Sequence, residues 1–288
     1  MPADPALRRT FGFGQMIDSA IAIPGTIAVP TDIPPGPPLT VAGRAASPPG
    51  PGDLYRIEHG IFVYSLAGVA SFRCTPGSIA LAAPTNADPA LIAELLVANA
   101  LPAVLWQQGS FVLHASAVVL DEDVGAIAIV GPAGSGKSSV AAALLDHGAL
   151  LVGDDSLRID CEATGATVSG LSGGLFDAIV PGEQRRFRPV TPDCAVPSAR
   201  LLGIAVLDER AASFRLDRVA RLRAVELLLA HRHRPGIPAL LGMRQSVVAQ
   251  ATAIARSVPV ALWHRRTGDL TISTGEVDAL RRCFATSG

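Results

Sequence analysis

The segment Gly131-Pro-Ala-Gly-Ser-Gly-Lys137-Ser138 constrains the fold of this chain more than any other feature. It follows the apolar run 126–130 and precedes an alanine- and leucine-rich stretch that predicts a helix over about 137–146. A glycine-rich turn that joins a buried strand to a helix and ends in Lys-Ser is typical of a phosphate-binding P-loop. The chain must therefore contain a strand–loop–helix unit, which predicts a mixed α/β fold.

The residue types of this loop match what a triphosphate requires. Small residues let successive backbone N–H groups surround a phosphate, and the helix N-terminus adds partial positive charge. Lys137 is the only lysine among 24 basic residues, and its compact ammonium suits a loop that a planar guanidinium does not. We expect Lys137 to contact the phosphates and Ser138 to bind Mg²⁺. The residues expected to hold ATP are Gly131, Ala133, Gly134, Ser135, Gly136, Lys137, Ser138 and Ser139.

Two acidic residues, Asp154 and Asp155, follow the next predicted strand (149–152), 17 and 18 residues after Lys137. Alone, such a pair is typical of a turn or a helix cap. Beside a P-loop, one carboxylate can assist Mg²⁺ while the other takes a proton from an attacking hydroxyl. His114 lies on the strand predicted before the P-loop strand, and this position brings it to the same cleft. A structural core histidine is the alternative interpretation.

These segments resemble one family. His114-Ala-Ser116, the P-loop and Leu151-Val-Gly-Asp-Asp155 resemble the C-terminal catalytic domain of HPr kinase/phosphorylase. They resemble more closely the HPr-kinase-related proteins of bacterial peptide-modification clusters, including lasso-peptide kinases. The resemblance implies a P-loop built into a mixed sheet, as in phosphoenolpyruvate carboxykinase. It also implies that Asp155 is the general base for a substrate serine and that His114 supports this aspartate.

The chain departs from that family in two segments. The Glu-Ile-Arg-Gly segment, whose Glu helps to hold Mg²⁺, is missing, and so is the Pro-Gly-Arg-Asn loop linked to phosphoserine phosphorolysis. We therefore expect a kinase without phosphorylase activity. Glu183 or Asp154 is the candidate second metal ligand, and Asp154 is preferred.

The organisation along the chain predicts two parts. Residues 1–108 form a β-rich region with an irregular Pro/Gly-rich loop over 30–52 and a helix over 89–107 that begins at Asp88-Pro89. Residues 109–288 form the P-loop kinase domain. Its further predicted elements are a hairpin over 157–169, helices over about 219–231 and 243–256, a strand near 259–264, and a last helix with a Ser273–Glu276 capping box.

Two basic clusters have competing interpretations. Arg185 and Arg186 follow a Pro-Gly turn, and they either grip the γ-phosphate or the acceptor, or are solvated. The second cluster is interpreted as a solvated helix and helix end. Its members are Arg218, Arg221, Arg223, His231, Arg232, His233 and Arg234.

Bulk properties limit the partners and the compartment. The net charge of −1 gives no field that recruits nucleic acid or an anionic membrane. Four widely spaced cysteines without a C-x-x-C pair argue against a zinc site and against a disulfide scaffold, and they favour a cytoplasmic protein. Arg8-Arg9 lacks the apolar run of an export signal, and the apolar stretch 90–106 contains Glu94 and Asn99, which favours a buried helix over a membrane segment.

The function predicted from the sequence is ATP-dependent phosphorylation of a serine in a peptide or small protein. A small-metabolite kinase and a nucleotide-gated, ATP-hydrolysing regulatory protein stay open as alternatives. The aspartate pair beside the P-loop favours phosphoryl transfer over a conformational switch. The oligomeric state stays open, with a homo-oligomer as one alternative, since the HPr kinase relatives form hexamers.

Overall fold

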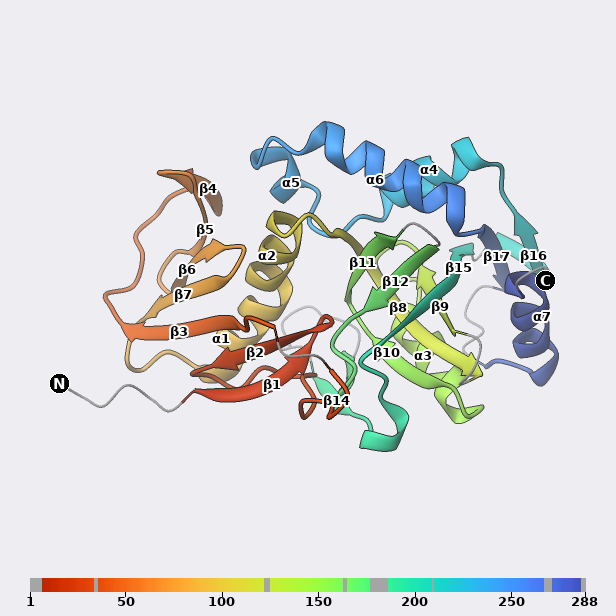
Figure 1. The fold of residues 1–288 in the computed structure, drawn as a ribbon, viewed down its shortest axis with the longest axis horizontal. Helices are drawn as coiled ribbons and strands as arrows, with labels where there is room; N and C mark the ends of the chain where they lie inside the picture. The colour runs from red at the N-terminus through yellow and green to blue at the C-terminus, as the bar shows by residue number, and fades with distance from the viewer. Residues whose placement is uncertain are drawn as a thin grey trace.

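The computed structural model describes residues 7–33, 36–121, 125–162, 165–176, 186–208, 210–266 and 271–285. The described chain is a mixed α/β structure in which two sheets flank a long helix (Figure 1). The first sheet comes from the N-terminal part of the chain, and the second carries the P-loop.

The first sheet has seven strands in the order β1-β2-β3-β7-β6-β5-β4. The pairs β2–β3 and β3–β7 are parallel and the others are antiparallel. The strands are β1 (Arg8–Gly12), β2 (Gln15–Ser19), β3 (Leu39–Ala45), β4 (Tyr55–Glu58), β5 (Ile61–Leu66), β6 (Ala70–Thr75) and β7 (Ser78–Ala83).

The prediction of an irregular loop over 30–52 is wrong for residues 39–45, which form strand β3. Leu39 and Val41 alternate with more exposed residues and are buried in the core, while their backbone pairs with β2 and β7. The prolines around this short segment hide its period of two, and both pairing partners are distant in sequence.

The long helix was predicted over 89–107, and the structure confirms it. It consists of α1 (Pro89–Leu95), a π-helical turn η1 (Leu96–Ala100) and α2 (Leu101–Gln107). The side chain of Asp88 accepts a 2.9 Å hydrogen bond from the backbone N of Ala90, as expected of an N-cap. Among the described helices, it alone is long and apolar enough to cross a membrane. Of its most apolar stretch, 67% is buried inside the protein.

The second sheet closes partly on itself. Strand β8 pairs with both β9 and β11, and the path β11-β12-β15 returns to β9, which lies parallel to β15. The sheet continues through β17 and β16, and β10 pairs with β8. The strands are β8 (Phe111–Asp121), β9 (Gly125–Val130), β10 (Leu150–Gly153), β11 (Ser156–Glu162), β12 (Gly165–Ser169), β15 (Ser198–Asp208), β16 (Arg210–Arg218) and β17 (Val260–Arg266).

Helices and short elements surround this sheet. Helix α3 packs on β8 and β9, and α4 packs on α6 (Figure 1). The capping box predicted at Ser273 and Glu276 is present at the start of α7. The remaining elements are α3 (Lys137–Asp146), α4 (Arg221–Ala230), α5 (Gly236–Leu240), α6 (Arg244–Ser257), α7 (Thr274–Phe284), a 3₁₀ turn η2 (Pro192–Cys194), and the pair β13 (Gly174–Phe176) and β14 (Phe187–Pro189).

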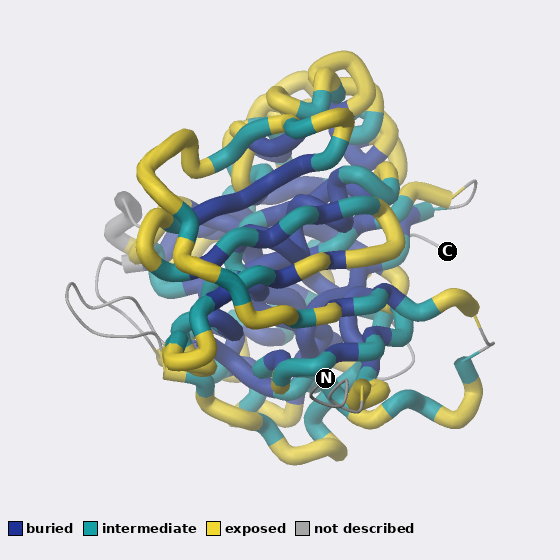
Figure 2. The backbone as a smooth tube through the Cα atoms, turned by 90° about the vertical axis from the view of Figure 1, so that its left-hand side faces the viewer, coloured by how far each residue is buried: buried dark blue, intermediate teal, exposed yellow. Residues whose placement is uncertain are grey.

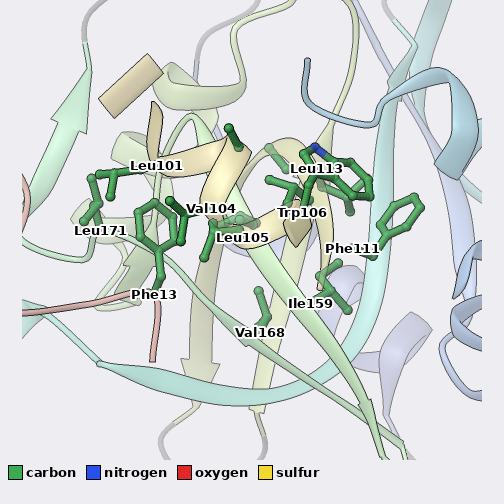
Figure 3. Close-up of a cluster of buried hydrophobic side chains, with 14 of the residues drawn as sticks. Phe13, Leu101, Val104, Leu105, Trp106, Phe111, Leu113, Ile159, Val168 and Leu171 are labelled. Carbon is green, nitrogen blue, oxygen red and sulfur yellow. The ribbon is translucent and has the colours of Figure 1, made fainter. Parts of the chain in front are cut away.

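One hydrophobic core joins the two sheets. Helix α2 contacts both β6 and β8, and its Trp106 packs edge-on against Phe111 of β8. Phe13, in the turn between β1 and β2, belongs to the same buried cluster as Val168 of β12 (Figure 3). A second buried cluster contains Ile129 of β9, Val140 of α3 and Phe284 of α7, and exposed residues are concentrated at turns and outer edges (Figure 2). The N-terminal sheet and α2 thus support β8, the strand that carries His114.

Candidate active site

The P-loop backbone depends on its glycines. Gly134 and Gly136 have φ values of +79° and +83°, in the left-handed region that favours glycine. A Cβ atom on Gly131 would lie 2.5 Å from Oγ of Ser135, which leaves no room for a side chain. These three positions therefore fix the tight turn between β9 and α3.

Lys137 begins α3 and points back into this loop. Its Nζ donates hydrogen bonds to the carbonyl oxygens of Gly131 at 3.2 Å and Pro132 at 3.1 Å, and the residue is buried. A buried ammonium requires such partners. The first turn of α3 begins with Lys137, Ser138 and Ser139 and contains no acidic residue, so the partial positive charge of its N–H groups faces the loop.

Asp154 is held beside the P-loop by three donors. Its Oδ1 accepts hydrogen bonds from Oγ of Ser138 at 3.0 Å and Oγ of Ser116 at 2.5 Å, and its Oδ2 accepts one from the backbone N of Phe176 at 2.8 Å. Burial raises the pKa of the Asp154 carboxyl, and the hydrogen bonds from Ser116 and Phe176 oppose this rise. The structure therefore brings together the two residues predicted to hold Mg²⁺, Ser138 and Asp154.

Asp155 adopts an unusual backbone conformation. Its φ of +71° is left-handed, which an aspartate tolerates better than most residues but still at an energetic cost. Three donors meet at its carbonyl oxygen: Nδ1 of His114 at 2.9 Å, Nδ1 of His233 at 3.2 Å and the backbone N of Ala115 at 3.3 Å. These contacts stabilise a turn in which Asp154 faces Ser116 and Ser138, while Asp155 faces the two histidines.

The side chain of Asp155 is buried, and its Oδ1 lies 3.7 Å from Nδ1 of His114. The His114 side chain is 35% exposed, so the pair sits at the edge of the protein interior. The backbone of His114 pairs with Ser156, the residue after Asp155, which places the imidazole beside the aspartate. The predicted proximity of His114 and Asp155 is therefore present in the structure.

His233 is a site residue that the sequence interpretation missed. The prediction of a solvated cluster is wrong for this residue, because it is only 5% exposed. Its backbone N donates a 2.8 Å hydrogen bond to the carbonyl of Val112, so the chain after α4 runs beside β8. Trp106 donates from Nε1 to the His233 carbonyl at 3.1 Å. No local pattern signals these contacts, because they join segments that are more than 100 residues apart.

Burial determines the protonation of His233. It lowers the pKa of the imidazole to about 4, against the opposing influence of Asp155, so the ring is neutral at pH 7. The rings of His233 and His114 lie edge to face with centroids 5.2 Å apart. The pKa of His231 is also lowered, first by burial and then by the neighbouring positive charges of Lys137 and His114.

Three further residues were candidates for contacts with the phosphates, the acceptor or the metal: Arg185, Arg186 and Glu183. Arg185 and Glu183 lie outside the described residues. Arg186 is exposed and immediately precedes Phe187 of β14. Phe187 pairs with Phe176, whose backbone N binds Asp154. Arg186 therefore adjoins the short ladder that supports the buried aspartate.

The donor set suits a magnesium-bound nucleoside triphosphate. The left-handed glycines of the loop, the α3 N-terminus and Lys137 form a cradle for phosphate oxygens. Ser138 and Asp154 present hydroxyl and carboxylate oxygens 3.0 Å apart, and Mg²⁺ prefers oxygen ligands of this kind. The arrangement can bind such a group, and it places a second carboxylate one residue away.

Comparisons with known proteins give similarity to solved structures. No family model matches the chain, and no curated protein matches it in sequence. Among solved structures, the chain is similar to the HPr(Ser) kinase/phosphatase from Coxiella burnetii. The TM-score is 0.36 and the sequence identity 16%, over 60% of this chain and 96% of that one.

Proposed function

We propose that this protein is an ATP-dependent phosphotransferase that phosphorylates a serine hydroxyl of a peptide or small protein. The observation that carries the proposal is the contrast between two adjacent carboxylates. The Asp154 carboxylate accepts a hydrogen bond from Ser138 of the P-loop, whereas Oδ1 of Asp155 lies 3.7 Å from Nδ1 of His114. This contrast supports a role for Asp154 on the phosphate and metal side and a role for Asp155 as the group that receives a proton.

The binding side consists of the P-loop and Asp154. The backbone N–H groups of 131–139 and the ammonium of Lys137 would bind the phosphates, and Ser138 with Asp154 would hold Mg²⁺. Bound Mg·ATP supplies the phosphoryl group and neutralises charge on its oxygens. Lys137 must exchange its present carbonyl partners, Gly131 and Pro132, for phosphate oxygens when the nucleotide binds.

The transfer side consists of Asp155 and its histidines. Asp155 would take the proton of the acceptor hydroxyl as the hydroxyl oxygen forms its bond to phosphorus and the bond to the leaving ADP oxygen breaks. His114 and His233 donate to the Asp155 carbonyl and so keep the carboxylate in its orientation. Both are positioning residues here, because the contacts they donate go to the backbone carbonyl of Asp155.

The choice of a serine acceptor rests on the family resemblance of the segments 112–155. The same resemblance, with its two missing segments, supports transfer in the forward direction without phosphorolysis. Nothing in the site geometry itself selects serine over another hydroxyl, so the experiment must compare acceptors.

The test supplies ATP labelled at the γ-phosphate, Mg²⁺, and either a serine-containing peptide library or a panel of hydroxylated metabolites. Label in the peptides supports the proposal. Label only in metabolites would show that the acceptor is a small metabolite and not a peptide. ADP formation without any labelled acceptor would favour a nucleotide-driven switch. A matched library with alanine in place of serine identifies the acceptor atom.

A further inference from the structure

We infer that His114, Asp155 and His233 form a Zn²⁺ site, separate from the Ser138–Asp154 pair, and that zinc bound there blocks Asp155. The first half stands on the geometry alone. The second half rests on the proposed function, because only a working base can be blocked.

The ligand atoms converge within coordination range. One nitrogen from each histidine and one carboxylate oxygen of Asp155 all lie within 4.8 Å of one another. Nδ1 of His114 is 3.7 Å from Oδ1 of Asp155, close to the separation of about 3.4 Å between ligands of a tetrahedral zinc. A shift of a few tenths of an ångström in the partly exposed His114 would bring this pair to that separation.

The chemistry of the donors selects the metal. Two imidazoles and one carboxylate suit zinc and related transition metals, whereas Mg²⁺ favours oxygen ligands alone. Ser138 and Asp154 offer only oxygens, 3.0 Å apart. The two neighbouring sites therefore differ in preference, and zinc need not displace magnesium from its own pair.

The three ligands are positioned by separate parts of the fold. His114 comes from β8, Asp155 from the turn between β10 and β11, and His233 from the chain after α4. The His233 backbone is held by Val112 and Trp106, and the Asp155 carbonyl accepts a hydrogen bond from the backbone N of Ala115 that zinc binding leaves in place. Ligands that are already ordered lose little entropy on binding a metal. The 35% exposure of the His114 side chain provides an entrance from solvent.

Zinc binding would change the hydrogen bonds of the site. Without zinc, Nδ1–H of both histidines donates to the Asp155 carbonyl. A zinc ion takes the lone pair of Nδ1, so the ring proton then resides on Nε2 and these two hydrogen bonds are lost. The Asp155 carboxylate shares its electrons with the metal and can no longer accept a proton from a hydroxyl.

The binding experiment uses the full chain and zinc alone. Competition with a chromophoric chelator should show one zinc equivalent bound, and Co²⁺ should give the visible d–d bands of a tetrahedral site. His233→Ala, His114→Ala and Asp155→Asn should each remove this equivalent. His59→Ala, which alters an exposed turn, should retain it. Circular dichroism checks folding, and the partly exposed His114 provides the variant that disturbs the core least.

Two outcomes would overturn the metal site. One is the absence of a bound equivalent in the folded wild-type protein. The other is a Co²⁺ spectrum with thiolate charge-transfer bands, which would assign the metal to the cysteines. Inhibition is measured separately: with a labelled peptide in hand, equimolar zinc should reduce transfer at least tenfold and a chelator should restore it. Zinc binding in a protein without transferase activity would contradict the proposed function and leave the site intact.

Discussion

Nδ1 of His233 lies 3.2 Å from the carbonyl oxygen of Asp155, although 78 residues separate them in the chain. This contact links the segment after α4 to the turn that follows β10. With His114 it secures a left-handed aspartate, a conformation that would otherwise be costly. The orientation of the proposed base thus depends on the packing of the second half of the chain.

Replacing His233 by alanine should lower the transfer rate by about 10- to 100-fold, because the turn that orients Asp155 loses a hydrogen bond at its carbonyl oxygen. Nucleotide affinity should change little, since Lys137 and the P-loop are untouched. The measurement is kcat and KM for transfer together with titration of a fluorescent ATP analogue. Equal losses in rate and nucleotide affinity would indicate general damage instead.

Replacing Lys137 by alanine should weaken ATP binding by at least about tenfold, the effect of losing hydrogen bonds to a charged group. Lys137→Arg should not restore it, because the planar guanidinium does not fit a loop closed by Gly131 and Gly136. Equilibrium titration with labelled ATP checks both variants. Arg9→Ala, on the exposed ion pair with Asp18, is the matched control and should bind normally.

The stability of the protein should depend on the protonation of His233. The folded state keeps this ring neutral down to about pH 4, whereas the unfolded chain protonates it near pH 6.5. The unfolded state therefore binds the extra proton between these values, and the contribution to stability is full above pH 6.5 and lost as pH falls toward 4. The expected loss is on the order of 3 kcal/mol.

Urea unfolding of the wild type and His233→Asn at pH 7 and pH 4.5 isolates this contribution. The variant should show a smaller loss of unfolding free energy between the two pH values. The raised pKa of Asp154 makes its own contribution to the unfolding free energy increase as pH falls, opposite to that of His233. Both proteins contain Asp154, so its contribution cancels in the comparison. Parallel pH profiles would show that His233 titrates normally.

Removing the Ser116 hydroxyl should destabilise the site locally. Ser116 is fully buried and donates a 2.5 Å hydrogen bond to Asp154, so Ser116→Ala leaves a buried carboxylate with one donor fewer. The expected cost is about 1–3 kcal/mol in the free energy of unfolding. Ser257→Ala, on an exposed helix end, should cost much less. A neutral Ser116→Ala variant would mean that Asp154 does not depend on this donor.

Local patterns predicted those parts of the fold that rely on nearby residues. The helix that begins at Asp88 and the capping box at Ser273 depend on contacts within four positions, and both are present. The P-loop, Asp154 and Asp155 meet because each follows a short, strongly apolar strand. Their proximity could therefore be predicted from the sequence.

The remainder required tertiary structure. Strand β3 is defined by partners in β2 and β7, and prolines obscure its short apolar alternation. His233 stands in a segment rich in arginine and histidine that resembles a solvated helix end. Its burial follows from Trp106 and Val112, and neither residue is its neighbour in sequence.

The assignment of Asp155 as the base is tested most directly by Asp155→Asn. Asparagine tolerates the left-handed conformation and leaves the backbone carbonyl in place for His114 and His233. Label transfer from ATP to serine peptides is measured beside the equilibrium affinity for ATP. The account predicts that the variant binds ATP like the wild type and loses transfer by about 100-fold or more. Transfer at the wild-type rate by this variant would contradict it.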